Sequence, residues 1–216
     1  MEHVWRKIEG LREQFEVLRK DRTPIDVFAF LELDLGLDPI PFDDLTAKYR
    51  VEAAIKADFT GIYLDAEQYK LMEKGPDWKL NRLRFTVAHE LAHYFLHRDL
   101  PQKENFASLP DFARWNESYG GRKYTVEQEA NEFAGRLLVP ETRLNAAFDE
   151  FAPDAEKLVP NFMQSGSLRD KFSEKVAPRF GVNAQVIASG WIVMPFGRRP
   201  SLCYLACRVE ADLVAA

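Results

Sequence analysis

The feature that most constrains this fold is a helix-forming segment that runs from Asp77 to about Leu100. Its centre, residues 84–97, reads RFTVAHELAHYFLH, and apolar residues flank its histidines and glutamate on both sides. A helix with this composition is expected to be buried. Buried imidazole and carboxylate groups need polar partners or a metal ion. The fold must therefore place such a partner beside this helix.

The helix contains the pattern H-E-x-x-H, with histidines at His89 and His93 and a glutamate at Glu90. Residues four apart lie on one helical face, so both imidazoles can reach one zinc ion. Zinc lowers the pKa of a water ligand to about 7, which lets a neighbouring carboxylate accept its proton. The pattern therefore predicts His89 and His93 as metal ligands and Glu90 as the catalytic base. The alternative is a helix with two partly exposed histidines and a surface ion pair.

A second predicted helix, from about Thr125 to Val139, supplies candidates for a third ligand. Thr125 and Gln128 form a capping-box pattern, and Pro140 stops the helix. Glu127 lies at the edge of the apolar face, so we predict that it is the third protein ligand of a catalytic zinc site. The alternative is a solvated carboxylate favoured by the helix dipole.

Asn131 follows Glu127 by four residues on the same helix. Its amide could accept the other ring N–H of a ligand histidine and fix that histidine's tautomer. Glu129 and Glu132 are expected to point toward solvent. His97 continues the row of histidines at 89 and 93, which leaves three roles open: an alternative ligand, a proton relay, or a histidine near the negative end of the helix dipole.

Hydrophobic periodicity elsewhere predicts an α+β fold that is mostly helical, with a small antiparallel sheet packed on the active-site helix. The predicted elements are a helix at 3–20, a helix from Thr23-Pro24 to Leu35, two antiparallel strands within 51–65, helical pieces over 141–190 and short strands at 190–195 and 201–208. We divide the chain into an N-terminal helix (1–23), a zincin-like core (24–165) and a helical C-terminal segment (166–216).

Composition limits the class of protein. Net charge is −5 and 46% of residues are hydrophobic, as in an ordinary globular protein. The N-terminus is charged from its second residue, and no run of about 18 apolar residues exists, so we expect neither a secretory signal nor a membrane span. Two cysteines are too few for a disulfide framework, which favours a cytoplasmic location.

Several further signals leave alternatives open. Tyr119, Tyr124 and Arg114 lie on or beside the loop between the two predicted metal helices and could stabilise an oxyanion or contact substrate. The strands at 51–65 could present an edge to an extended peptide, or a loop could cover that edge. Residues 172–187 resemble a helix-turn-helix, which could bind DNA or pack beside the core. The acidic chain favours packing.

The segments RFTVAHELAHYFLH and EQEANEFAGRLLVPE, in this order, resemble the ImmA/IrrE-type metallo-endopeptidases. The resemblance spans roughly residues 24–190 and departs from the family at Ala92, where glycine is frequent. It implies two histidine ligands (His89, His93), one glutamate ligand (Glu127) and Glu90 as acid and base. It also implies a substrate, a separate helix-turn-helix repressor, because too little sequence precedes residue 24 for a DNA-binding domain.

We therefore expect a zinc-dependent endopeptidase that cleaves a protein partner and so derepresses stress-response or mobile-element genes. Histidine and carboxylate ligands also suit Mn²⁺, so manganese is the alternative metal. Two other functions stay open: a metal-binding regulator that sequesters its partner without cleavage, and a DNA-binding protein with a zincin-like core. Direct nucleic-acid binding is not expected, and no membrane association is expected.

Overall fold

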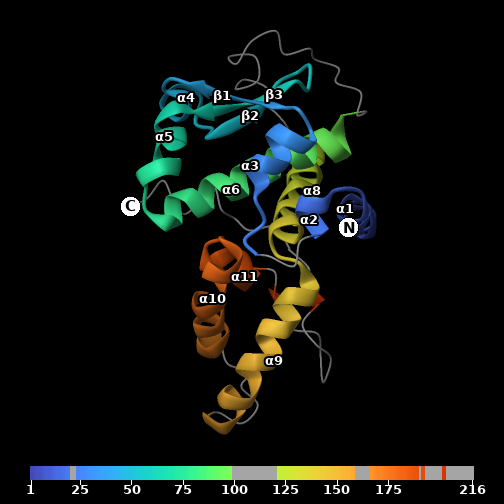
Figure 1. The fold of residues 1–216 in the computed structure, drawn as a ribbon, viewed down its shortest axis with the longest axis vertical. Helices are drawn as coiled ribbons and strands as arrows, with labels where there is room; N and C mark the ends of the chain where they lie inside the picture. Colours follow the sequence, from blue (N-terminus) through green and yellow to red (C-terminus); the bar gives the residue numbers. More distant parts are fainter. Residues whose placement is uncertain (20–22, 99–120, 159–165, 190, 193–200, 203–216) are drawn as a thin grey trace.

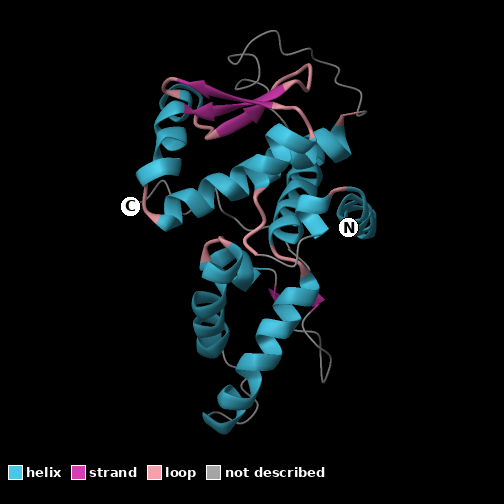
Figure 2. Ribbon diagram, in the orientation of Figure 1, coloured by secondary structure: helices cyan, strands magenta, loops and turns pink. Residues whose placement is uncertain are grey.

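The computed structural model describes residues 1–19, 23–98, 121–158, 166–189, 191–192 and 201–202 (Figure 1). Helices dominate, and a small sheet lies at one end of the molecule (Figure 2). The α-helices are α1 (Glu2–Gln14), α2 (Glu16–Arg19), α3 (Val27–Ala29), α4 (Leu45–Tyr49), α5 (Ala66–Lys74), α6 (Asp77–Ala92), α8 (Gly121–Leu138), α9 (Glu141–Leu158), α10 (Gly166–Phe180) and α11 (Ala184–Ser189). Two π-helical turns, η1 (Phe30–Asp34) and η2 (His93–His97), extend α3 and α6. The predicted α+β class is confirmed.

The sheet has three strands in the order β1-β3-β2, formed by β1 (Asp38–Phe42), β2 (Ala53–Ile55) and β3 (Gly61–Asp65). β2 and β3 pair antiparallel, as predicted for residues 51–65. β1 pairs parallel with β3, so the prediction of an antiparallel sheet was wrong for this strand and the sheet is mixed.

The two prolines in β1 explain why the sequence did not reveal this strand. The Asp38 N–H donates to the carbonyl of Thr60, so Asp38 and every second residue after it direct their backbone groups toward β3. Pro39 and Pro41 therefore fall on the outer side of an edge strand, where a missing N–H breaks no pairing. The close approach of the strands also requires Gly61, since a Cβ there would lie 2.6 Å from the Asp38 carbonyl oxygen.

Helix α6 runs beneath the sheet and packs against α8 (Figure 1). Both helices bury apolar faces in the core, including Val87, Leu91, Phe133 and Leu137. A two-point ion pair between Arg82 of α6 and Glu52, at 2.7 and 2.8 Å, fixes the start of β2 against α6. The helix that carries the histidines is thereby held between the sheet and α8.

The N-terminal predictions needed correction at the helix boundaries. The predicted helix at 3–20 is broken at Phe15, whose backbone is extended. The next helix begins at Val27 with Asp26 as its cap, later than the predicted start at Thr23-Pro24. Gly36 follows this helical segment with a positive φ of 62°.

The start of α8 also differs from prediction. The helix begins at Gly121, four residues earlier than expected, so Thr125 is interior to it and the predicted capping box is absent. Its end at Leu138, just before Pro140, agrees with the prediction.

Helices α10 and α11 form the predicted helix-turn-helix arrangement, with Gly181 in the turn at a φ of 60°. This turn is held on α6 by two side chains of that helix. The guanidinium Nε of Arg84 donates to the Gly181 carbonyl at 3.0 Å, and the Asn81 amide donates to the Val182 carbonyl at 3.3 Å. The unit therefore packs on the helix that carries the histidines.

The strands β4 (Trp191–Ile192) and β5 (Ser201–Leu202) pair antiparallel within the predicted terminal strands. Cys203 and Cys207 lie outside the described residues. Among the described residues, no helix is both long and apolar enough to cross a membrane. The predicted division into 1–23, 24–165 and 166–216 stays a prediction.

Candidate metal centre

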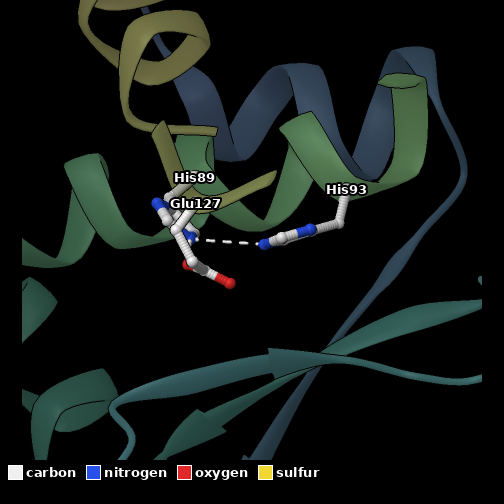
Figure 3. A group of neighbouring side chains, drawn as sticks. All are labelled: His89, His93 and Glu127. Carbon is white, nitrogen blue, oxygen red and sulfur yellow. Dashed lines mark hydrogen bonds and ion pairs between the residues drawn. The ribbon is translucent and has the colours of Figure 1, made fainter. Parts of the chain in front are cut away.

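Three side chains from the two central helices point toward one another on the side of α6 that faces the sheet (Figure 3). His89 and His93 come from the C-terminal end of α6 and the first residue of η2, and Glu127 comes from α8. His89 Nε2 lies 3.1 Å from Glu127 Oε2 and 3.3 Å from His93 Nε2. The ligand atoms of all three lie within 4.8 Å of one another. The structure thus brings together the three residues that the sequence predicted as metal ligands.

The spacing of these atoms fits a metal ion. In a tetrahedral zinc site with bonds of about 2.0–2.1 Å, neighbouring ligand atoms lie about 3.3 Å apart. Two of the three separations here, 3.1 and 3.3 Å, are close to that value, and the third is no more than 4.8 Å. Two imidazole nitrogens and one carboxylate oxygen also make up a donor set typical of catalytic zinc. The residues present therefore fit a metal of this kind.

Asn131 supports His89 from the side away from Glu127. Its side-chain Oδ1 lies 3.0 Å from His89 Nδ1. An amide oxygen can only accept, so the Nδ1–H of His89 donates to it. When the His89 ring is neutral, its Nε2 therefore has a free electron pair that faces Glu127 and His93. This is the contact that the sequence suggested for Asn131.

Glu90 is buried beside the three residues, with 8% of its surface exposed. Its Oε2 accepts a hydrogen bond of 2.8 Å from the backbone N–H of Ile55 in β2. Burial raises the pKa of Glu90 to about 7, against the opposing effects of His89 and of the Ile55 hydrogen bond. A carboxyl group with this pKa can both accept and release a proton near neutral pH.

The two histidines have opposite pKa shifts in the metal-free protein. Burial lowers the pKa of His89, but the hydrogen bond and charge of Glu127 outweigh it and raise the pKa to about 9. Burial and the neighbouring charge of His89 lower the pKa of His93 to about 3. Near neutral pH the metal-free protein therefore has a protonated His89 and a neutral His93.

His97 lies in the last helical turn, as predicted, but its ring is buried, with 7% exposed. Its Nδ1 lies 2.9 Å from His93 Nδ1 and its Nε2 lies 3.2 Å from Glu129 Oε2. Burial lowers the pKa of His97, although Glu129 opposes this. His97 is not one of the three converging residues. It contacts one of them, His93, at the ring nitrogen Nδ1.

The prediction that Glu129 and Glu132 face solvent was wrong. Glu129 is 19% exposed and contacts His97. Glu132 is fully buried, and its Oε1 accepts hydrogen bonds from Trp5 Nε1 at 2.5 Å and from Arg136 Nε at 2.6 Å. Helix α1 packs across this face of α8 and covers it. The sequence of α8 alone could not reveal that covering helix.

The predicted oxyanion and substrate contacts fall at the edge of what the structure describes. Arg114 and Tyr119 lie outside the described residues. Tyr124 lies in the first turns of α8, where the backbone is described and the side chain is not. Their roles stay predictions.

Two groups at the site were missed at the sequence level. The backbone N–H of Ile55 carries no side-chain signal, so only the fold could place it against Glu90. Glu129 was assigned to solvent, although its position two residues after Glu127 and the row of histidines at 89, 93 and 97 were visible. Contacts between this row of histidines and the glutamates of α8 could therefore have been predicted from the sequence.

A comparison with protein-family models matches residues 76–191 to the IrrE N-terminal-like domain of a peptidase family. The match covers more than half of the chain and includes both helices of the site. The chain belongs to this family. The resemblance stated from the sequence is thereby confirmed, and so are the zincin-like fold and a metallopeptidase type of protein. No curated protein matches the chain.

Proposed function

We propose that this protein is a zinc-dependent endopeptidase in which His89, His93 and Glu127 hold the metal and Glu90 is the catalytic base. The convergence of two imidazole nitrogens and one carboxylate oxygen beside a second, buried glutamate carries this proposal. Three protein ligands, rather than four, are typical of a catalytic zinc site. Manganese suits the same ligands and is the alternative metal.

Zinc, when bound, polarises the scissile carbonyl and makes an attacking water more acidic. Glu90 accepts the proton of that water at a carboxylate oxygen and later donates it to the nitrogen of the leaving amine. The Ile55 N–H fixes one Glu90 oxygen, Oε2, and so sets the direction of the other. The pKa of about 7 suits both halves of this transfer. A positive metal ion would lower that pKa and favour the base form at neutral pH.

The strand β2 suggests how an extended peptide would bind. Glu52 and Lys56, on either side of β2, form their backbone hydrogen bonds with β3. Alternation along the strand then directs the backbone groups of Ala53 and Ile55 away from β3. Ile55 donates on that side to Glu90, so this edge runs directly beside the catalytic carboxylate. A substrate strand added to the edge would carry its carbonyls past Glu90.

We infer that the substrate is a separate helix-turn-helix repressor, as the family resemblance implies. Direct DNA binding by this chain has weaker support, although α10 and α11 have the matching arrangement. The turn between them is hydrogen-bonded to α6, and α11 contains no lysine or arginine for phosphate contacts. Sequestration of the repressor without cleavage remains the second candidate, because a groove that binds a peptide can hold it uncut.

A cleavage assay tests the proposal. The chain is co-expressed with the helix-turn-helix protein encoded beside it, as wild type and as Glu90→Gln, and the partner is analysed by mass spectrometry. Partner fragments with wild type alone would support the protease and locate the cleaved bond. An intact partner in a stable complex with both forms would favour sequestration instead.

A further inference from the structure

We propose that His97, Glu129 and His3 form a hydrogen-bonded chain that holds His93 in the tautomer required for metal binding. Helix α1 would thereby help to position the metal centre. This inference rests on the proposed metal ligands but not on proteolysis. His97 is in this account a positioning residue, since it acts through His93.

The chain consists of three successive contacts. His93 Nδ1 lies 2.9 Å from His97 Nδ1, on the side of the ring away from the metal ligands. His97 Nε2 lies 3.2 Å from Glu129 Oε2, and the other oxygen, Oε1, lies 3.2 Å from His3 Nε2. The protein has four histidines, and with His89 all four belong to one connected cluster. The cluster extends from α1, through α8, to the end of α6.

The carboxylate fixes the direction of every hydrogen bond in the chain. An ionised Glu129 can only accept, so His97 Nε2 and His3 Nε2 must each carry the proton. A neutral His97 that is protonated at Nε2 presents a lone pair at Nδ1. His93 must then donate from its own Nδ1–H, and its Nε2 keeps a free electron pair.

The reverse direction conflicts with metal binding. If His97 donated from Nδ1, His93 would accept at Nδ1 and a neutral His93 would carry its proton at Nε2. That nitrogen lies 3.3 Å from His89 Nε2, within the group of ligand atoms. A neutral His97 with its proton at Nδ1 would also turn a lone pair toward Glu129. Only one direction of this hydrogen bond is therefore compatible with metal binding, namely donation from His93 Nδ1–H to His97 Nδ1.

The two predicted metal histidines are supported in parallel ways. Asn131 Oδ1 accepts from His89 Nδ1, and His97 Nδ1 accepts from His93 Nδ1. A hydrogen-bond acceptor behind a ligand histidine fixes its tautomer and ring orientation, and loss of it costs about 10–100-fold in metal affinity. Asn131 is an acceptor by itself, whereas His97 needs Glu129 to define its tautomer.

Helix α1 secures the outer end of the chain. It also contacts α8 through Trp5, which donates to Glu132, and through Arg12, which donates to the Arg136 and Leu137 carbonyls at 2.7 and 3.2 Å. His3 extends this line of contacts to Glu129. Helix α1 lies outside the residues matched to the family, 76–191, so this support comes from a separate part of the protein.

The expected effects decrease from the buried end of the chain to the exposed end. Exposed surface rises from 7% for the His97 side chain to 19% for Glu129 and 52% for His3. We expect His97→Leu to lower the zinc affinity about 10–100-fold. Glu129→Leu should lower it less, and His3→Leu least. His97→Asn is the matched control, because its Oδ1 can still accept from His93 Nδ1, and it should restore most of the affinity.

The test combines zinc titration against a chromophoric chelator with ¹⁵N NMR of the histidine rings. In the wild-type protein loaded with zinc, we expect the proton at Nε2 of His97 and at Nδ1 of His93. A His97 ring protonated at Nδ1 or at both nitrogens would overturn the proposal. Equal zinc affinity in wild type and His97→Leu would overturn it as well.

The spectrum of the unmodified protein decides the question even if His97→Leu does not fold. The outcome is also separate from that of the cleavage assay. Zinc binding with the expected tautomers but without cleavage would support this chain and count against the protease. No zinc binding by the folded wild type would overturn both.

Discussion

Two acidic groups on α8, little more than one turn apart, have opposite surroundings. Glu132 is fully buried and has a fixed cation, Arg136, at 2.6 Å. Glu127 lies 3.1 Å from the imidazole of His89 and near a second carboxylate, Glu90. The charge that Glu132 contacts is therefore permanent, whereas the charge of His89 beside Glu127 depends on a proton that the ring can lose.

The difference separates a structural carboxylate from a candidate ligand. An arginine keeps its charge at all ordinary pH values, but a histidine can lose its proton. A metal ion can therefore replace the proton of His89 beside Glu127, whereas the charge of Arg136 beside Glu132 stays in place. Burial alone does not distinguish the two, and the more deeply buried glutamate is the structural one.

The largest expected effect concerns Glu90, which is neither a predicted metal ligand nor the partner of an arginine. Glu90→Gln should lower the rate of peptide hydrolysis by about 10²–10⁴-fold, because general-base catalysis contributes that much. Zinc affinity should stay close to that of wild type. The rate is measured on a cleaved partner peptide and zinc by titration. Unchanged hydrolysis would remove Glu90 from the mechanism.

Loss of the structural carboxylate should reduce stability strongly. Glu132→Leu leaves the buried Arg136 without its main partner, and we expect the free energy of unfolding to fall by about 3–5 kcal/mol. Glu127→Leu should cost much less, because His89 can become neutral. Urea unfolding of the metal-free proteins measures both effects.

The double variant Glu132→Leu with Arg136→Leu is the control for this comparison. It removes both charges, so most of the lost stability should return. Equal losses for Glu127→Leu and Glu132→Leu would erase the distinction between the two glutamates.

For zinc affinity, the order of the two glutamates should be reversed: loss of Glu127 should have the larger effect. Glu127→Gln removes a predicted ligand, and we expect zinc affinity to fall by at least about 100-fold, no less than for loss of an outer contact. Glu132→Gln should leave the zinc affinity of the folded protein within about threefold of wild type, since it contacts no ligand. Competition with a chelator measures both. A larger loss for Glu132→Gln would contradict the assignment.

Proton release is the smallest expected effect. The pKa of His89 is about 9 in the metal-free protein, so below that pH its ring carries a proton that zinc must displace. Near pH 7.5, zinc binding should release about one proton from His89, and the apparent affinity should rise with pH until about pH 9. Titration calorimetry in two buffers of different ionisation enthalpy measures this number. Identical heats in both buffers would show that no proton leaves.

The sequence predicted those parts of the molecule that depend on local pattern. Spacing placed His89 and His93 on one helical face, and the edge of an apolar face singled out Glu127 and Asn131. The antiparallel pair β2–β3 followed from alternation along the chain. Each of these features is determined by residues near one another in sequence.

The features that the sequence did not predict depend on distant partners. Helix α1 buries Glu132 by a contact across 127 positions, so no pattern within α8 could separate Glu132 from a solvated residue. Strand β1 was missed because its prolines suit only an outer edge, and that edge exists only once β3 lies beside it. The Ile55 N–H reaches Glu90 because α6 packs beneath the sheet.

The proposed function depends on a metal ion bound between His89, His93 and Glu127. A crystal structure of the zinc-loaded protein, with diffraction data collected on both sides of the zinc absorption edge, tests it most directly. We expect one anomalous peak about 2.0–2.2 Å from the Nε2 atoms of both histidines and from a Glu127 oxygen. A peak bound by His97 in place of Glu127, or no peak at these residues at saturating zinc, would contradict it.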